Sequence, residues 1–218
     1  MSSHYARRMD AAARRGRLAS SRLYLVLEAR PHGNDPRPLL DAALRGGVDV
    51  VQLRDKELDD EGLIEAATPF RAACEEHGAL FILNDRPDLA EACNAAGVHV
   101  GRGDTPVADA KALVWPNRLV GLSASTIEEL EDAGEADYVG VTAFATPTKE
   151  DAVAGGLDLV RAAAEVLTVP WFAIGGIDLS NVEEVAAAGA PGVAVVRAIR
   201  DADDPESAAR TLRATLDR

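Results

Sequence analysis

The chain alternates between short β-branched runs and longer segments of helical composition, and this alternation limits the available folds more than any other feature. Strand-helix alternation implies parallel strands joined by right-handed crossovers. The runs predicted as strands are residues 22–27, 48–53, 80–83, 98–100, 118–122, 138–141, 171–174 and 192–196. The segments predicted as helices are residues 38–45, 60–77, 87–96, 107–115, 126–133, 157–167, 181–188 and 205–216.

Eight such units in 218 residues favour a closed (β/α)8 TIM barrel, a fold that typically takes about 250 residues. An open, doubly wound sheet is the alternative that the alternation also permits. Prolines begin several of the predicted helices and glycines follow their ends, as helix boundaries favour. Without a linker in the sequence, we expect a single barrel domain over residues 21–218, preceded by a basic helical extension over residues 1–20.

Charge and cysteine content narrow the class of protein. A net charge of −13 argues against binding nucleic acid through a broad basic surface. No apolar run approaches the roughly 20 residues of a membrane span. Cys74 and Cys93 have no C-x-x-C spacing, so two reduced thiols in a cytoplasmic protein are expected. The sequence thus predicts small-molecule partners, neither nucleic acid nor membrane, and leaves a homo-oligomer open.

The second predicted strand ends in polar and charged side chains. Successive side chains of a strand point to opposite faces, so Gln52, Arg54 and, if the extension continues, Lys56 share one side. An amide, a guanidinium and an ammonium that converge at the end of a buried strand form a receptor for an anion. The segment alone fits equally well a solvated strand end followed by a helix cap.

Other strand ends carry polar residues on the same side of the predicted barrel, where barrel enzymes place their chemistry. Asp85 and Asp104 follow the third and fourth strands, and either one alone is best explained as a helix N-cap, because Pro87 and Pro106 come two residues later. Together, on adjacent strands, the two carboxylates could hold Mg²⁺, which prefers one or two carboxylates with water and substrate phosphates.

The later strand ends add glycine and hydroxyl groups. Gly175-Gly176 is either a tight turn or a place where backbone N–H groups approach a phosphate, a common site after strands seven and eight. The string Thr146-Pro147-Thr148-Lys149 suits an anionic or polar ligand. His99 lies inside a strand, and we interpret it as a packed histidine of the barrel wall rather than a catalytic one.

In combination these strings resemble the thiamine-phosphate synthase (thiamine-phosphate pyrophosphorylase) family, from about residue 22 to the C-terminus. The strings are Leu23-Tyr-Leu-Val26, Gln52-Leu-Arg-Asp-Lys56, Asn84-Asp-Arg-Pro-Asp-Leu-Ala90, Gly97-Val-His-Val-Gly101 with Asp104, Gly121-Leu-Ser123, Asp137-Tyr-Val-Gly140, Thr146-Pro-Thr-Lys149 and Ala173-Ile-Gly-Gly-Ile177. No single string is specific, but their order and spacing together are.

The resemblance implies a (β/α)8 transferase that joins 4-amino-2-methyl-5-pyrimidinylmethyl diphosphate to thiazole phosphate, giving thiamine monophosphate and pyrophosphate. It implies Mg²⁺ as cofactor, held by Asp85 and Asp104, and dissociative loss of pyrophosphate without a side-chain nucleophile. The implied catalytic residues are Arg54, Lys56 and Lys149. The implied substrate-binding residues are Gln52, Arg54, Lys56, Asn84, Ser123, Thr146, Thr148, Lys149, Gly175, Gly176, Val196 and Arg197.

Three departures and two alternatives accompany the resemblance. Leu27-Glu28 stands where the family commonly has Thr-Asp. The family usually has serine where this chain has Arg197, and its sixth-strand loop is usually one residue longer. A related thiazole tautomerase is one alternative, but that enzyme is expected to carry histidine at the position of Ser125. A non-catalytic phosphate-binding barrel is the other, and the retained acids and bases argue against such a decayed site.

Overall fold

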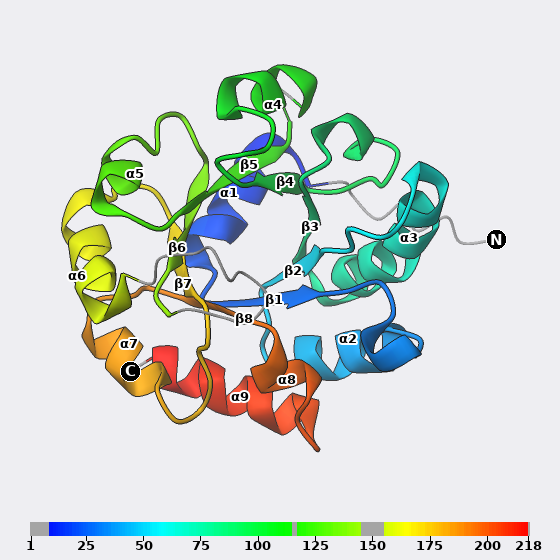
Figure 1. Ribbon diagram of the computed structural model, residues 1–218. Coiled ribbons are helices and arrows are strands. Elements are labelled where there is room, and N and C mark those ends of the chain that lie inside the picture. The colour runs from blue at the N-terminus through cyan, green and yellow to red at the C-terminus, as the bar shows by residue number, and fades with distance from the viewer. Residues whose placement is uncertain (1–8, 115–116, 145–154, 218) are drawn as a thin grey trace.

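Eight parallel strands close into a barrel in the computed structural model, which describes residues 9–114, 117–144 and 155–217. Each strand pairs with the next along the chain, and β1 pairs with β8 to close the barrel (Figure 1). The strands are β1 (Leu23–Leu27), β2 (Val50–Leu53), β3 (Leu80–Asn84), β4 (Gly97–Val100), β5 (Leu119–Ala124), β6 (Tyr138–Thr142), β7 (Trp171–Ile174) and β8 (Val193–Val195). The predicted TIM barrel is confirmed, and the open sheet is excluded.

Helices surround the strands as an outer layer, apart from α1, which lies behind the strands in Figure 1. The α-helices are α1 (Ala11–Ser20), α2 (Arg37–Arg45), α3 (Asp60–His77), α4 (Val107–Val114), α5 (Ile127–Glu131), α6 (Gly156–Val166), α7 (Val182–Ala187), α8 (Arg197–Arg200) and α9 (Pro205–Leu216). Two short 3-10 helices, η1 (Pro31–Gly33) and η2 (Pro87–Leu89), follow β1 and β3.

The predicted helix over residues 87–96 is wrong. Only η2 forms there, and turns follow it up to Asn94, whose φ of 51° is left-handed. Asparagine tolerates this conformation better than most residues, and a left-handed residue cannot continue an α-helix. The third crossover of the barrel is therefore a compact turn rather than a helix.

Side-chain alternation along the strands divides the core into two layers. Leu23, Leu25 and Leu27 of β1 belong to the large cluster between strands and helices, whereas Tyr24 and Val26 belong to a second cluster inside the barrel. The same period of two holds around the barrel, as parallel strands covered by helices require. The inner cluster fills the barrel below the site, so the interior is a packed core with an open upper end.

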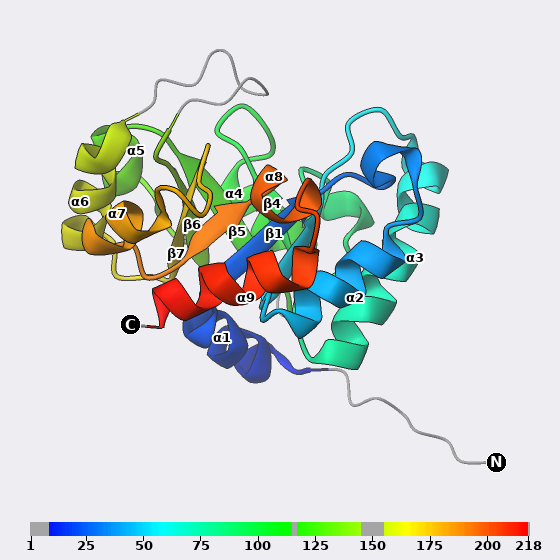
Figure 2. The ribbon, with the colours of Figure 1, turned by 90° about the horizontal axis from the view of Figure 1, so that it is seen from below.

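Helix α1 closes the lower end of the barrel, opposite the end where α8 begins (Figure 2). Its Leu18 is 2% exposed and belongs to the inner cluster together with Leu80 and Leu119. Arg15 pairs with Asp137, with 3.2 Å between Nε and Oδ1. The basic residues of the extension therefore neutralise carboxylates at the amino-terminal ends of strands.

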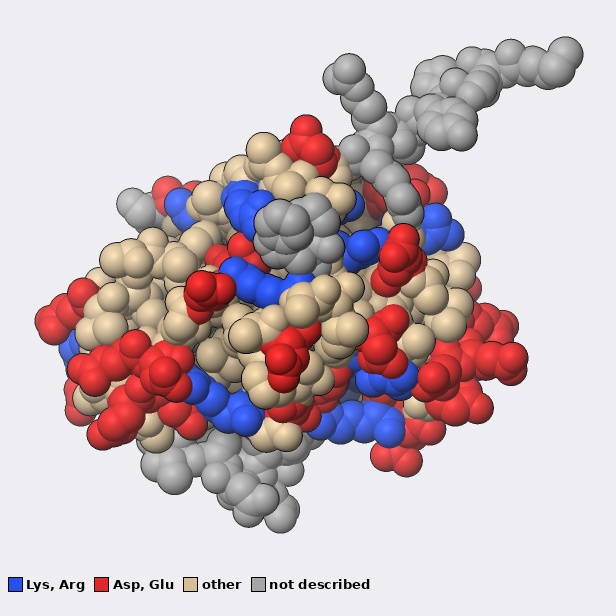
Figure 3. All heavy atoms as spheres, turned by 90° about the horizontal axis from the view of Figure 1, so that it is seen from above, with Lys and Arg blue, Asp and Glu red and all other residues tan. Residues whose placement is uncertain are grey.

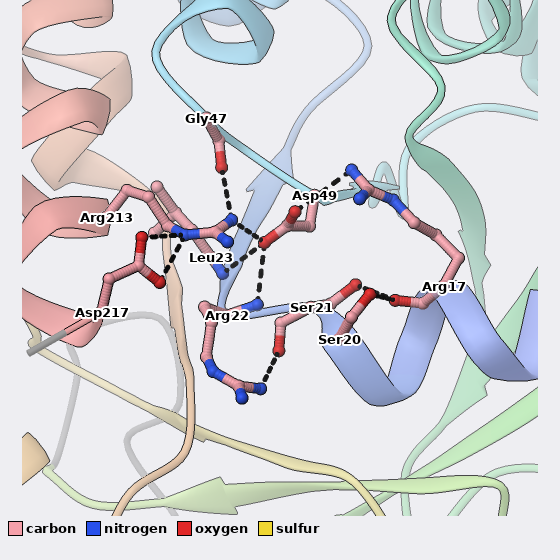
Figure 4. Close-up of polar contacts among 9 residues, drawn as sticks. All are labelled: Arg17, Ser20, Ser21, Arg22, Leu23, Gly47, Asp49, Arg213 and Asp217. Atoms are coloured by element: carbon pink, nitrogen blue, oxygen red, sulfur yellow. Dashed lines mark hydrogen bonds and ion pairs between the residues drawn. The ribbon is translucent and has the colours of Figure 1, made fainter.

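Asp49 ties α1 to the barrel just before β2 begins (Figure 4). Its Oδ2 accepts hydrogen bonds from the backbone N–H groups of Arg22 and Leu23 at 2.8 and 3.2 Å, and from Arg213 Nη1 of α9 at 2.6 Å. Its Oδ1 lies 3.1 Å from Arg17 Nη2 of α1. One carboxylate with 3% exposure thus joins four segments of the lower end.

Surface charge agrees with the acidic composition on the face shown in Figure 3. Asp and Glu gather at both flanks of this face, and Lys and Arg lie scattered between them rather than in one basic patch. Among the helices that the structure describes, none is both long enough and apolar enough to cross a membrane.

Candidate active site

A cavity of about 1020 Å³ opens at the carboxyl ends of the strands, and residues of all eight strands line it. Every predicted site residue in the described part of the chain lines this cavity. These residues are Gln52, Arg54, Lys56, Asn84, Asp85, Asp104, Ser123, Gly175, Gly176, Val196 and Arg197. Thr146, Thr148 and Lys149 lie outside the described residues.

The cavity brings two acids and an ammonium group together above β3 and β4. Lys56 Nζ lies 3.1 Å from Asp85 Oδ2, and Asp104 Oδ2 accepts a hydrogen bond of 2.8 Å from the backbone N–H of Gly101. Burial raises the pKa of Asp85, and the nearby Asp104 carboxylate raises it further, against the lowering effect of Lys56. A bound cation would offset the burial and like-charge costs that raise this pKa.

Neither carboxylate has the contacts of a helix N-cap. The residue at the N-cap position of η2 is Arg86, which makes no side-chain cap hydrogen bond, and Asp85 pairs with Lys56 instead. Asp104 accepts its hydrogen bond from the backbone N–H of Gly101, which precedes it, rather than from α4. Asp85 also has a φ of 60°, a strained conformation for a residue other than glycine. Geometry therefore favours a ligand-binding role for the two acids.

The turn after β7 requires glycine. Gly175 and Gly176 have φ values of 103° and 58°, and a Cβ on Gly175 would lie 2.2 Å from the carbonyl oxygen of Phe144. Asn181 Nδ2 donates to the Gly176 carbonyl at 2.9 Å, which fixes the turn from α7. Glycine is thus needed for the close packing of this turn against Phe144, and the turn presents backbone without side chains to the cavity, as a phosphate-binding turn does.

The β8 side of the cavity carries its own charged groups. Arg197 begins α8 and lines the cavity, and Arg200 Nη1 contacts Glu28 Oε1 at 3.0 Å. Hydrogen bonds from Ser180, and to a smaller extent the charge of Arg197, lower the pKa of Asp178, so this carboxylate stays ionised. Cationic groups therefore lie at two separate places around the mouth, one near β2 and one near β8.

The cavity floor holds three polar residues that the sequence did not assign to the site: Tyr24, His99 and Tyr138. The histidine is part of the wall, as expected, but both ring nitrogens also make hydrogen bonds at the cavity, to the Tyr138 hydroxyl and to Ser123 Oγ. The strand period places each of these residues at an inward position of its strand, but it does not show which residues meet across the barrel.

Comparison with known proteins identifies the family. The family model described as thiamine monophosphate synthase matches residues 23–199. A thiamine-phosphate synthase of Streptomyces avermitilis is 48% identical over 202 residues, covering 89% of this chain and 93% of that protein. One of Nostoc sp. is 46% identical over 204 residues, covering 92% of this chain but 57% of the longer relative.

A solved structure agrees with these relatives. Thiamine phosphate pyrophosphorylase from Pyrococcus furiosus superimposes with a TM-score of 0.83 at 33% sequence identity, covering 92% of this chain and 97% of that one. Sequence, fold and cavity thus agree with the resemblance and with the expected enzyme class, a transferase. The chain belongs to the thiamine monophosphate synthase family.

Proposed function

We propose that the protein joins 4-amino-2-methyl-5-pyrimidinylmethyl diphosphate to a thiazole phosphate and releases pyrophosphate, as a thiamine-phosphate synthase. The observation that carries this proposal is the meeting of Asp85, Asp104 and Lys56 at one cavity mouth, with Arg54 lining the same cavity. Such a group of charges suits a ligand with several negative charges, and pyrophosphate leaves a carbon atom only when its developing charge is stabilised.

The bond changes need no side-chain nucleophile. The C–O bond between the pyrimidinyl methylene and the diphosphate breaks, and its electron pair stays with the diphosphate oxygen. The thiazole nitrogen then donates its lone pair to the methylene carbon. Arg54 and Lys56 would stabilise the departing charge, and Gln52, Asn84 and Ser123 would orient the pyrimidine diphosphate. Holding both substrates in one cavity supplies the remaining rate enhancement by positioning.

Mg²⁺ fits the acidic side of this cavity. Asp85 and Asp104 supply the one or two carboxylates that Mg²⁺ prefers, and the substrate diphosphate would complete its oxygen ligands. The raised pKa of Asp85 supports the assignment, because burial beside a second carboxylate is costly without a cation. When bound, the ion would neutralise charge on the leaving diphosphate.

The thiazole phosphate would bind on the opposite side, at the turn after β7 and the start of α8. Gly175, Gly176 and Val196 would offer backbone groups there, and Arg197 a guanidinium. Thr146 and Thr148 are assigned to the same phosphate, and Lys149 to the diphosphate, by family resemblance alone.

A cytoplasmic location belongs to this proposal and is supported by the two free, buried thiols, Cys74 and Cys93. A homo-oligomer also stays a prediction.

The test is to mix the purified protein with both substrates and Mg²⁺, and to measure pyrophosphate and thiamine monophosphate. With both substrates present, we expect equal amounts of pyrophosphate and thiamine monophosphate. When the thiazole phosphate is left out, we expect no thiamine monophosphate. Isomerisation of the thiazole phosphate alone, without pyrophosphate, would favour the tautomerase instead. Binding of either substrate without any turnover would favour the non-catalytic barrel.

Lys56→Ala should lower kcat/KM about 30-fold or more, which corresponds to about 2 kcal/mol of transition-state stabilisation lost with one charged donor. The side chain is 56% exposed, so thermal stability should change little. Steady-state pyrophosphate release measures the effect. Lys111→Ala is the matched control, because Lys111 lies 4.0 Å from Asp137 at the lower end of the barrel. Equal kinetics for the two variants would remove Lys56 from the site.

A further inference from the structure

Five side chains form a continuous hydrogen-bonded chain across the cavity floor, from β2 through β1, β6 and β4 to β5. Gln52 Nε2 donates to the Tyr24 hydroxyl at 3.0 Å, and that hydroxyl lies 3.1 Å from the hydroxyl of Tyr138. The Tyr138 hydroxyl lies 3.3 Å from His99 Nδ1, and His99 Nε2 lies 3.0 Å from Ser123 Oγ. All five residues line the cavity, so the chain links two groups that would contact substrate.

Packing fixes the two tyrosine rings in place. A Cβ on Gly121 would lie 2.1 Å from Tyr138 Cζ, so the ring occupies space that only glycine at residue 121 leaves. The Tyr24 ring meets the Phe172 ring edge-to-face, with centroids 5.2 Å apart and an interplanar angle of 83°. The hydroxyl groups cannot move away from their partners without disturbing these contacts.

Each tyrosine has a single proton to donate. Burial raises the pKa of Tyr24 and of Tyr138, so both phenols remain neutral at physiological pH. A neutral phenol donates one hydrogen bond and accepts others. The direction of each bond in the chain therefore depends on the direction of its neighbours.

If each hydroxyl donates to the next member of the chain, a single direction begins with donation by Gln52. Tyr24 accepts from Gln52 and donates to Tyr138, and Tyr138 in turn donates to His99 Nδ1. The imidazole proton is then on Nε2 and points at Ser123 Oγ, since a neutral imidazole carries one donor and one acceptor. Ser123 accepts this hydrogen bond, so its own O–H is available to donate to a ligand in the cavity. The reverse direction would turn the Ser123 proton toward His99.

We propose that Tyr24, Tyr138 and His99 are positioning residues that polarise this chain, so that Gln52 offers its amide oxygen and Ser123 its hydroxyl proton to one substrate. The proposal rests on the proposed function: an aminopyrimidine amine would donate to Gln52, and a diphosphate oxygen would accept from Ser123. The three residues act through the two ends of the chain and need not touch the reacting atoms.

The first test reads the imidazole directly and needs no substrate. Nitrogen NMR of the ¹⁵N-labelled full-length protein, at a pH where the ring is neutral, distinguishes the two tautomers, and His99→Gln assigns the signals. We expect the Nε2–H tautomer of His99 in the parent protein and a mixture in Tyr138→Phe or Tyr24→Phe. An Nδ1–H tautomer in the parent, or a ratio unchanged in both variants, would overturn the proposal. This outcome is independent of whether the protein makes thiamine monophosphate.

The second test measures coupling through Ser123. Tyr138→Phe keeps the ring against Gly121 and should lower kcat/KM about tenfold, with no further loss when it is added to Ser123→Ala. Thr142→Val is the control. Thr142 lines the same cavity, but its hydroxyl accepts a hydrogen bond from Ser125 and does not belong to the five-residue chain. The effect of Thr142→Val should multiply with that of Ser123→Ala. If the effect of Tyr138→Phe on kcat/KM also multiplies with that of Ser123→Ala, the tyrosine does not act through Ser123. Tyr24→Phe serves the same test if Tyr138→Phe does not fold.

Discussion

Asp85→Asn should lower kcat about 10²–10³-fold, a loss of about 3–4 kcal/mol in the transition state, and leave the protein at least as stable as its parent. Activity falls because an amide cannot supply the negative charge that a divalent cation needs. Stability is kept because the pKa of Asp85 in the folded protein lies above its ordinary value. Ionised Asp85 thus costs folding free energy at neutral pH, and this cost is absent from an amide.

Asparagine is the right replacement because the backbone of residue 85 is left-handed, with a φ of 60°, and asparagine tolerates this conformation as well as aspartate does. Alanine would add backbone strain and confuse the two effects. Turnover and melting temperature are measured on the same preparation. Asp88→Asn is the control, since Asp88 pairs with Arg86 outside the cavity and its side chain is half exposed. A variant at residue 85 that melts early but turns over normally would show that the carboxylate serves the fold alone.

The parts of the fold with a strong local signal were predictable. The bounds of α3 and α9 match the prediction, and the structure adds N-caps one residue before each start, where Asp59 and Asp204 accept backbone hydrogen bonds. The strands were found because inward and outward positions are both apolar over most of their length. The segment over residues 87–96 failed because proline and alanine favour a helix there, while Asn94 terminates it locally.

The charged rim of the site was also predictable, since Lys56, Asp85 and Asp104 follow strands whose ends share one side of any parallel barrel. The floor was not. Tyr24 and Tyr138 are 114 residues apart in sequence, and only the closed barrel brings their hydroxyls to 3.1 Å. The strand period of two tells which face a residue occupies, but not which residue it meets across the barrel.

The role of Asp49 at the lower end of the barrel was not predictable either, because the sequence shows only an aspartate between valines. Its partners come from α1, β1 and α9, so they cannot be read from neighbouring residues. Four groups rely on this one side chain: two backbone N–H groups and two guanidiniums. A buried group with this many partners is expensive to remove, because each partner loses its compensation at once.

Asp49→Ala should therefore lower the free energy of unfolding by about 3–5 kcal/mol, or the melting temperature by about 10 °C in a chain of this size. Urea unfolding of the parent and the variant measures the change. Asp217→Ala is the control, because Asp217 bonds the same Arg213 from α9 with a side chain that is 51% exposed, and should cost less than about 1 kcal/mol. Turnover per folded molecule should stay at the parental value, since Asp49 lies at the end of β2 opposite the cavity. A loss no larger than that of Asp217→Ala would mean that water replaces the carboxylate and that α1 is held by its apolar contacts instead.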